Sequence, residues 1–175
     1  MDERPDGLTA GGDIRRPGWM STKVVVTETV EGRPGLKVGY FGDHVGYSDE
    51  TIEMGGDDEY PSPLTYLAWA TGWCLLAQVT RYARLRKVAL RKATCRVEMD
   101  WRLQGSVLRG DVSASCEGVR AQVEIDSEAD TEAVAQVIRL AESGCFVSRI
   151  IQLPVVLDLT LEVNGAPVSV PAGLG

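Results

Sequence analysis

The stretch SPLTYLAWATGWCLLAQVTRYARLR, residues 62–86, decides the fold because it predicts one long helix. Ser62 is a hydroxyl N-cap residue, and Pro63 suits the first helical position, where its missing N–H group is harmless. Apolar side chains then recur with a period close to 3.6 residues. We therefore expect a long, mostly buried helix that ends near Arg86.

Strand-like patterns lie on both sides of this helix. Two β-branched segments flank a Gly- and Pro-containing turn at residues 31–35 and predict a hairpin. Alternating apolar residues predict two further strands after the helix. The expected strands cover residues 23–30, 36–40, part of 42–52, 88–103 and 109–125.

The C-terminal third of the chain predicts a second helical region. Residues 126–143 open with acidic side chains and then show an apolar helical face. Ser143-Gly144 ends this helix, a short helix follows over residues 145–152, and a final strand is expected over residues 154–163. Because strands and helices are segregated, the order favours an α+β fold.

The composition narrows the class of protein. The chain has 175 residues and a net charge of −7, which argues against nucleic acid as a partner. No apolar run is long enough for a membrane helix, and no signal peptide is visible, so we expect a cytoplasmic protein with reduced thiols. We expect a flexible arm over residues 1–21, rich in Gly and Pro, and a single domain over residues 22–175.

Two of the four cysteines draw attention because each lies in an apolar, helical pattern. Cys74 and Cys145 form no CxxC motif, so the choice lies between a redox pair and two buried packing residues. Cys145 follows the break at Ser143-Gly144, near a helix N-terminus, where the helix dipole favours a thiolate. Cys95 and Cys116 alternate along expected strands, and we interpret them as core residues.

These elements resemble the OsmC/Ohr family, the osmotically inducible and organic hydroperoxide resistance proteins. The resemblance runs over most of residues 22–165. It rests on the Pro-Ser-Pro-Leu entry at residues 61–64 to the helix of Cys74, the strand pair that follows, and Ala-Glu-Ser-Gly-Cys at residues 141–145. It implies an OsmC-like fold, with antiparallel sheets around a long central helix, in an intertwined homodimer.

The resemblance also implies a chemistry. Cys74 matches the family's peroxidatic cysteine, Cys145 its resolving cysteine, and Arg33 the arginine that pairs with the reactive thiolate. The implied function is the thiol-dependent reduction of organic hydroperoxides in oxidative-stress defence, with a cellular dithiol as reductant. We expect no bound metal or organic cofactor, since the single His44 excludes a multi-histidine site.

One position departs from the family. The catalytic glutamate lies ten residues before the first cysteine, and Leu64 stands there in this chain. Arg33 would then be unsupported, or a carboxylate of residues 57–59 (Asp57, Asp58 or Glu59) would take the glutamate's place. The alternative function is a non-enzymatic OsmC-like dimer that binds a small hydrophobic ligand or senses oxidation, and a mainly structural dimer is a third reading.

Large apolar side chains near Cys74 predict either a substrate pocket or a packing surface. Trp69 and Trp73 are four residues apart on the expected helix. With Leu64 and Phe146 they could line an apolar pocket for a hydroperoxide or another hydrophobic ligand. Large aromatic residues also serve cores and dimer interfaces, so both interpretations stand.

Overall fold

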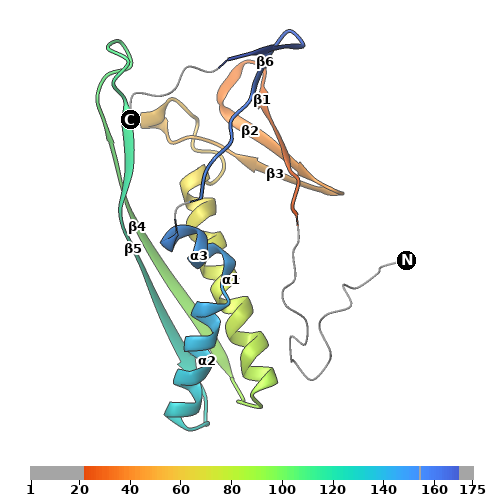
Figure 1. Cartoon of the computed structure of the whole chain (residues 1–175), viewed down its shortest axis with the longest axis vertical. Coiled ribbons are helices and arrows are strands. Elements are labelled where there is room, and N and C mark those ends of the chain that lie inside the picture. The colour runs from red at the N-terminus through yellow and green to blue at the C-terminus, as the bar shows by residue number, and fades with distance from the viewer. Residues whose placement is uncertain (1–21, 154, 170–175) are drawn as a thin grey trace.

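The computed structural model describes residues 22–153 and 155–169. In this part of the chain, three antiparallel sheets and three α-helices form an α+β arrangement, as the sequence predicts (Figure 1). The expected arm over residues 1–21 lies outside the described residues.

The first sheet has the strand order β1-β2-β3. It comprises β1 (Val26–Val30), β2 (Arg33–Phe41) and β3 (His44–Ser48). The predicted hairpin is confirmed with a tighter turn, because Arg33 already pairs with Val30. Gly32 makes this turn with a φ of +74°, a conformation that glycine adopts without steric cost. Arg33 is therefore the first residue of a strand.

A short 3-10 helix, η1 (Ile52–Met54), leads through a loop to helix α1 (Pro63–Leu85). The predicted helix start is confirmed, since Ser62 accepts a hydrogen bond from the Thr65 amide at 3.4 Å. Helix α1 contacts two later helices and strand β4. The first sheet lies beyond its N-terminal end (Figure 1).

The second sheet is a long hairpin of β4 (Lys92–Gln104) and β5 (Ser113–Asp126), which runs alongside α1 (Figure 1). Apolar residues alternate on the face toward the helices, for example Cys95 opposite Val123. Charged residues alternate with them, and Arg120 binds Glu98 at 3.1 Å and Asp100 at 2.7 Å. The alternation thus separates a packing face from a solvated one.

Helices α2 (Thr131–Ser143) and α3 (Phe146–Gln152) close the core over α1. Asp130 caps α2 by accepting the backbone N–H groups of Glu132 and Ala133 at 2.9 and 3.2 Å. The buried cluster, which we call the core cluster, comprises Leu75, Val79, Ala83, Val137, Ala141 and Cys145.

The prediction of a strand over residues 154–163 is wrong for most of its length. Residues 155–160 form no regular structure, and position 154 lies outside the described residues. Only β6 (Leu161–Val163) is a strand, and it pairs with the unpredicted β7 (Ala166–Val168) across Asn164-Gly165. Both turn residues have positive φ, as a two-residue hairpin turn requires. The apolar run before β6 finds no strand partner within the described chain, and Val156 is 92% exposed.

Candidate functional site

The fold brings Cys74 and Cys145 together, although they are far apart in the sequence. Cys74 lies midway along α1, and Cys145 is the N-cap residue of α3. Cys145 is fully buried in the core cluster, and Cys74 packs against the same cluster. Both cysteines are free thiols. The side chain of Cys145 hydrogen-bonds to that of Cys74.

The surroundings of Cys74 act on its pKa in both directions. Burial raises the pKa most, and hydrogen bonding and charge from Cys145 raise it further. The backbone N–H groups of Val147 and Phe146 oppose this by hydrogen bonding to the sulfur. The net pKa stays above the ordinary thiol value. The start of α3 therefore favours a thiolate on Cys74, but the thiol needs a further cation to ionise readily.

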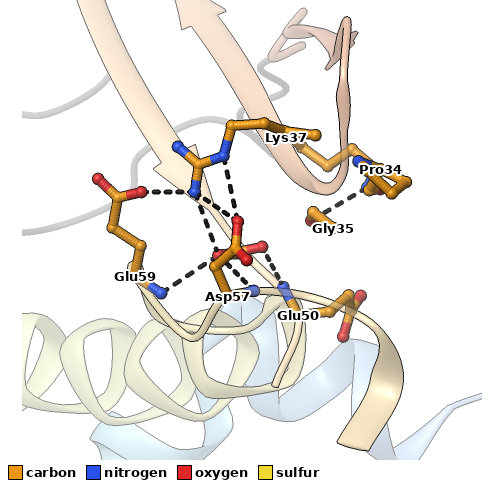
Figure 2. Close-up of polar contacts among 8 residues, drawn as sticks. Pro34, Gly35, Lys37, Glu50, Asp57 and Glu59 are labelled. Atoms are coloured by element: carbon orange, nitrogen blue, oxygen red, sulfur yellow. Dashed lines mark hydrogen bonds and ion pairs between the residues drawn. The ribbon is translucent and has the colours of Figure 1, made fainter. Parts of the chain in front are cut away.

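Arg33 is held by two carboxylates of the loop before α1. Its Nη2 donates to Asp57 at 2.9 Å and to Glu59 at 2.5 Å, and its Nε donates to Asp57 at 3.2 Å (Figure 2). These bonds, first Glu59 and then Asp57, raise the pKa of Arg33. Asp58 has a φ of +54°, so the chain turns there and its two neighbours bind the same guanidinium.

A buried carboxylate, Asp49, shapes this loop. Its Oδ1 accepts the Glu50 amide at 2.9 Å, and its Oδ2 accepts the amides of Asp57 and Glu59 at 3.2 Å each (Figure 2). Arg33 Nη2 lies 3.9 Å from Oδ2. Burial would raise the pKa of Asp49, but the three N–H donors and Arg33 outweigh it and lower the pKa. Asp49 had no signal in the sequence beyond its acidic side chain.

Arg33 and Cys74 share no hydrogen bond or ion pair among the described residues. Among the described contacts, the hydrogen bonds and ion pairs of Arg33 go to Asp57, Glu59 and Asp49. Cys74 lies 11 residues after Pro63, the first residue of α1, or about 16 Å along the helix axis at 1.5 Å per residue. The arginine is instead fixed at the loop that precedes the helix.

An apolar groove of about 580 Å³ lies between α1 and β4. Leu64, Trp69 and Trp73 line it together, and the two tryptophan rings are 5.5 Å apart. Neither Phe146 nor Cys74 is among the lining residues. The far wall comes from β4, which contributes Cys95, Met99 and Trp101. The alternation of apolar residues along β4 could have predicted this wall. Phe146 was predicted to line the pocket only because its side chain is hydrophobic.

The two remaining cysteines differ in their surroundings. Cys95 is half-buried and packs against the core cluster, in line with its interpretation as a core residue. Cys116 is exposed, so the prediction that it packs in the core is wrong. The β4–β5 hairpin extends past the N-terminal end of α1 (Figure 1). Cys116 lies on its second strand, opposite Trp101.

The model of one protein family, described as OsmC-like protein, matches residues 56–160. This chain belongs to the OsmC-like family. The matched segment includes α1, the β4–β5 hairpin, both helices of the core and both Cys74 and Cys145.

Solved structures share the OsmC-like fold at low sequence identity. An OsmC-like protein from Mycoplasma pneumoniae matches with a TM-score of 0.62 and 14% identity, covering 75% of this chain and 88% of that one. An organic hydroperoxide resistance protein OsmC from Legionella pneumophila matches with a TM-score of 0.59 and 16% identity, covering 77% and 92%. An organic hydroperoxide resistance protein from Elizabethkingia anophelis matches with a TM-score of 0.55 and 15% identity, covering 77% of this chain and 91% of that one. No curated protein matches this sequence at a significant level.

The described part of this OsmC-like chain contains no cluster of three or more His, Cys, Asp or Glu side chains that could hold a metal ion. None of the helices in that part is both long and apolar enough to cross a membrane.

Proposed function

We propose that this OsmC-like protein is a thiol-dependent peroxidase that reduces organic hydroperoxides in oxidative-stress defence. The observation that carries the proposal is the interaction of the Cys74 and Cys145 thiols at the start of α3. Two relatives by fold are named organic hydroperoxide resistance proteins, which supports the same chemistry here.

In the first step, the thiolate of Cys74 attacks the terminal oxygen of the hydroperoxide. The O–O bond breaks, a sulfenic acid forms on Cys74, and the alkoxide takes up a proton and leaves as an alcohol. Cys74 has the position for this step because it is only half-buried, whereas Cys145 is closed off from solvent.

In the second step, Cys145 resolves the sulfenic acid. Its sulfur attacks that of Cys74, a disulfide forms, and water leaves with the thiol proton. The backbone N–H groups of Val147 and Phe146 stabilise the Cys74 thiolate that begins the first step. A cellular dithiol then reduces the disulfide by thiol exchange, so the cycle needs no bound metal or organic cofactor.

Arg33 would supply the cation that ionises Cys74, and Asp57 and Glu59 would do the work of the family's missing glutamate. Their bonds to Arg33 support this role, although Leu64 occupies the glutamate position. Because Arg33 is anchored ahead of α1, we propose that a second copy of the chain brings its own Arg33 to Cys74 in a homodimer. Arg33 would then activate the thiol across the subunit boundary.

Exposed apolar side chains support this homodimer. Trp73 is 59% exposed, and Leu108 and Val156 are almost fully exposed in the single chain. Large exposed apolar surface marks interaction sites in soluble proteins. We place the dimer in the cytoplasm, where dithiol reductants keep thiols reduced.

A second function is favoured by the groove between α1 and β4. Leu64, Trp69 and Trp73 line it, but Cys74 does not. A groove that holds an apolar ligand away from the reactive thiol suits a non-enzymatic binding protein. The two functions differ in whether a hydrophobic hydroperoxide is consumed or only bound.

The test is the consumption of cumene hydroperoxide by the purified protein with excess dithiol. We expect turnover in the wild type and in Cys116→Ser, whose exposed thiol lies outside the pair, and none in Cys74→Ser. Equal rates in the wild type and Cys74→Ser would contradict the peroxidase proposal. Quenching of tryptophan fluorescence by the hydroperoxide without its consumption would instead support the binding function.

A further inference from the structure

A third thiol lies next to the reactive pair. Cys95 packs against the core cluster from β4, and Cys74 packs against it from α1. The helix and the strand approach closely because Gly72 faces Cys95. A side-chain carbon added at Gly72 would lie 3.9 Å from the Cys95 sulfur and 3.5 Å from Val97. Cys74 and Cys95 therefore both pack against the buried cluster to which Cys145 belongs.

Cys145 acts on the pKa of both other cysteines. Burial is the main cause that raises the pKa of both Cys74 and Cys95, and Cys145 raises each of them further. Cys145 therefore lies near enough to both to act on their charge. It is also the residue of the three that solvent cannot reach, since its exposed fraction is 0%.

Cys95 differs from the pair in what it faces. It lines the apolar groove between α1 and β4, together with Trp69 and Trp73, whereas Cys74 and Cys145 do not. A disulfide between Cys74 and Cys145 would bury one of its sulfurs completely. A dithiol reductant has to reach a sulfur directly. The groove offers a second point of access, at Cys95, besides the half-buried Cys74.

We propose that Cys95 is a second disulfide partner of Cys145 and moves the disulfide from the reactive pair to the wall of the groove. The inference rests on the proposed function, which supplies the first disulfide from a hydroperoxide.

The transfer is a thiol–disulfide exchange within one chain. The thiolate of Cys95 attacks the sulfur of Cys145, the bond between Cys74 and Cys145 breaks, and a bond between Cys95 and Cys145 forms. Cys74 leaves as a thiolate, and the proton released by Cys95 restores the balance of charge. No oxidant or reductant is consumed in this step. Cys74 is free again for a second hydroperoxide while the first disulfide awaits reduction from the groove.

The chain is well suited to a test by peptide mapping. Cleavage after Lys and Arg places the four cysteines in four different peptides, residues 38–81, 93–96, 110–120 and 140–149. The wild type is treated with one equivalent of cumene hydroperoxide, alkylated at increasing times and digested without reduction. We expect a cross-link between 38–81 and 140–149 first, which is then replaced by one between 93–96 and 140–149.

Variants separate the transfer from the first oxidation. In Cys95→Ser and Cys95→Ala, the first cross-link should form at an unchanged rate and then persist, and steady-state turnover with dithiol should fall several-fold. Cys116→Ser, on the same hairpin, should behave as the wild type. Both Cys95 variants are tested because one of them could fold poorly. Circular dichroism detects such a folding defect.

A first cross-link that persists in the wild type as it does in Cys95→Ser would overturn the proposal. The same experiment with diamide, which oxidises thiols without a hydroperoxide, keeps the two proposals apart. Transfer to 93–96 after diamide, in a protein that does not consume hydroperoxide, would support the exchange and reject the peroxidase. Consumption of hydroperoxide without transfer would support the peroxidase and reject the exchange.

Discussion

Cys145, the buried N-cap residue of α3, interacts with Cys74 in the middle of α1. This relationship depends on how closely the turn between α2 and α3 approaches α1. Gly144 makes that approach possible, because a side-chain carbon there would collide with the Tyr82 hydroxyl. Gly144, the residue before Cys145, thus sets how closely this turn packs against α1.

Gly144→Ala should loosen the thiol pair. The added methyl group must push Tyr82 or the turn aside, which costs about 1–3 kcal/mol in the free energy of unfolding, as overpacking does elsewhere. Disulfide formation between Cys74 and Cys145 should slow as well. Gly46→Ala is the matched control, because a side-chain carbon there would meet open space. Urea unfolding of both variants checks this, and equal losses would contradict the packing argument.

Asp49 should make the loop before α1 sensitive to acid. Its folded-state pKa lies below the ordinary value, so its stabilising contribution is present above about pH 4 and is lost as the pH falls further, through the folded pKa. Asp49→Asn should lower the free energy of unfolding at pH 7, because charged acceptors stabilise more than neutral ones. The gap between variant and wild type should narrow below pH 4.

Unfolding followed between pH 2 and pH 7 provides the measurement for Asp49. A gap that stays constant over this range would show that the carboxylate is already protonated in the folded protein. In that case the three N–H donors would not be holding an ionised Asp49.

The carboxylates around Arg33 should matter for turnover more than for stability. With Asp57→Asn and Glu59→Gln combined, Arg33 loses both of its anchors, and kcat/KM for cumene hydroperoxide should fall about tenfold to a hundredfold. Stability should change little, because such exposed ion pairs contribute at most about 1 kcal/mol each. Asp58→Asn is the control, since Asp58 forms no ion pair with Arg33 among the described contacts. An equal loss in the control would refute the assignment.

The pH dependence of Cys74 should report whether Arg33 reaches it. Burial and Cys145 raise the pKa of Cys74, so a protein without a nearby cation should ionise this thiol only above the ordinary thiol pKa. Alkylation of Cys74 by iodoacetamide should therefore keep rising through pH 9 in Arg33→Ala. In the wild type it should level off at lower pH. Identical profiles would mean that Arg33 does not act on the Cys74 thiolate.

Local signals in the sequence were enough to predict most of the elements. Ser62 and Pro63 start α1 where expected. Alternating residues predict β4 and β5, although each strand begins four residues later and ends one residue later than expected. The apolar run after residue 154 led to the wrong prediction of a long strand, because a strand also needs a neighbouring strand to pair with. The alternation along β5 also led to a wrong prediction for Cys116, which is exposed.

The candidate site could be predicted only in part from the sequence. Three consecutive carboxylates at residues 57–59 offered partners for Arg33, but the backbone turn at Asp58 decides that Asp57 and Glu59 bind it. Asp49 could not have been singled out, because its role comes from amides that the loop brings to it. The position of Phe146 outside the groove likewise depends on where α3 docks.

The most direct measurement of the central claim is a single turnover with one equivalent of cumene hydroperoxide in the presence of dimedone, which traps sulfenic acids. The wild type should lose two hydrogen atoms as the disulfide forms and gain little adduct. Cys145→Ser should carry the adduct on the peptide of residues 38–81, which contains Cys74. An adduct on another cysteine peptide, or none in Cys145→Ser, would contradict the assignment of Cys74 as the attacking thiol and Cys145 as its partner.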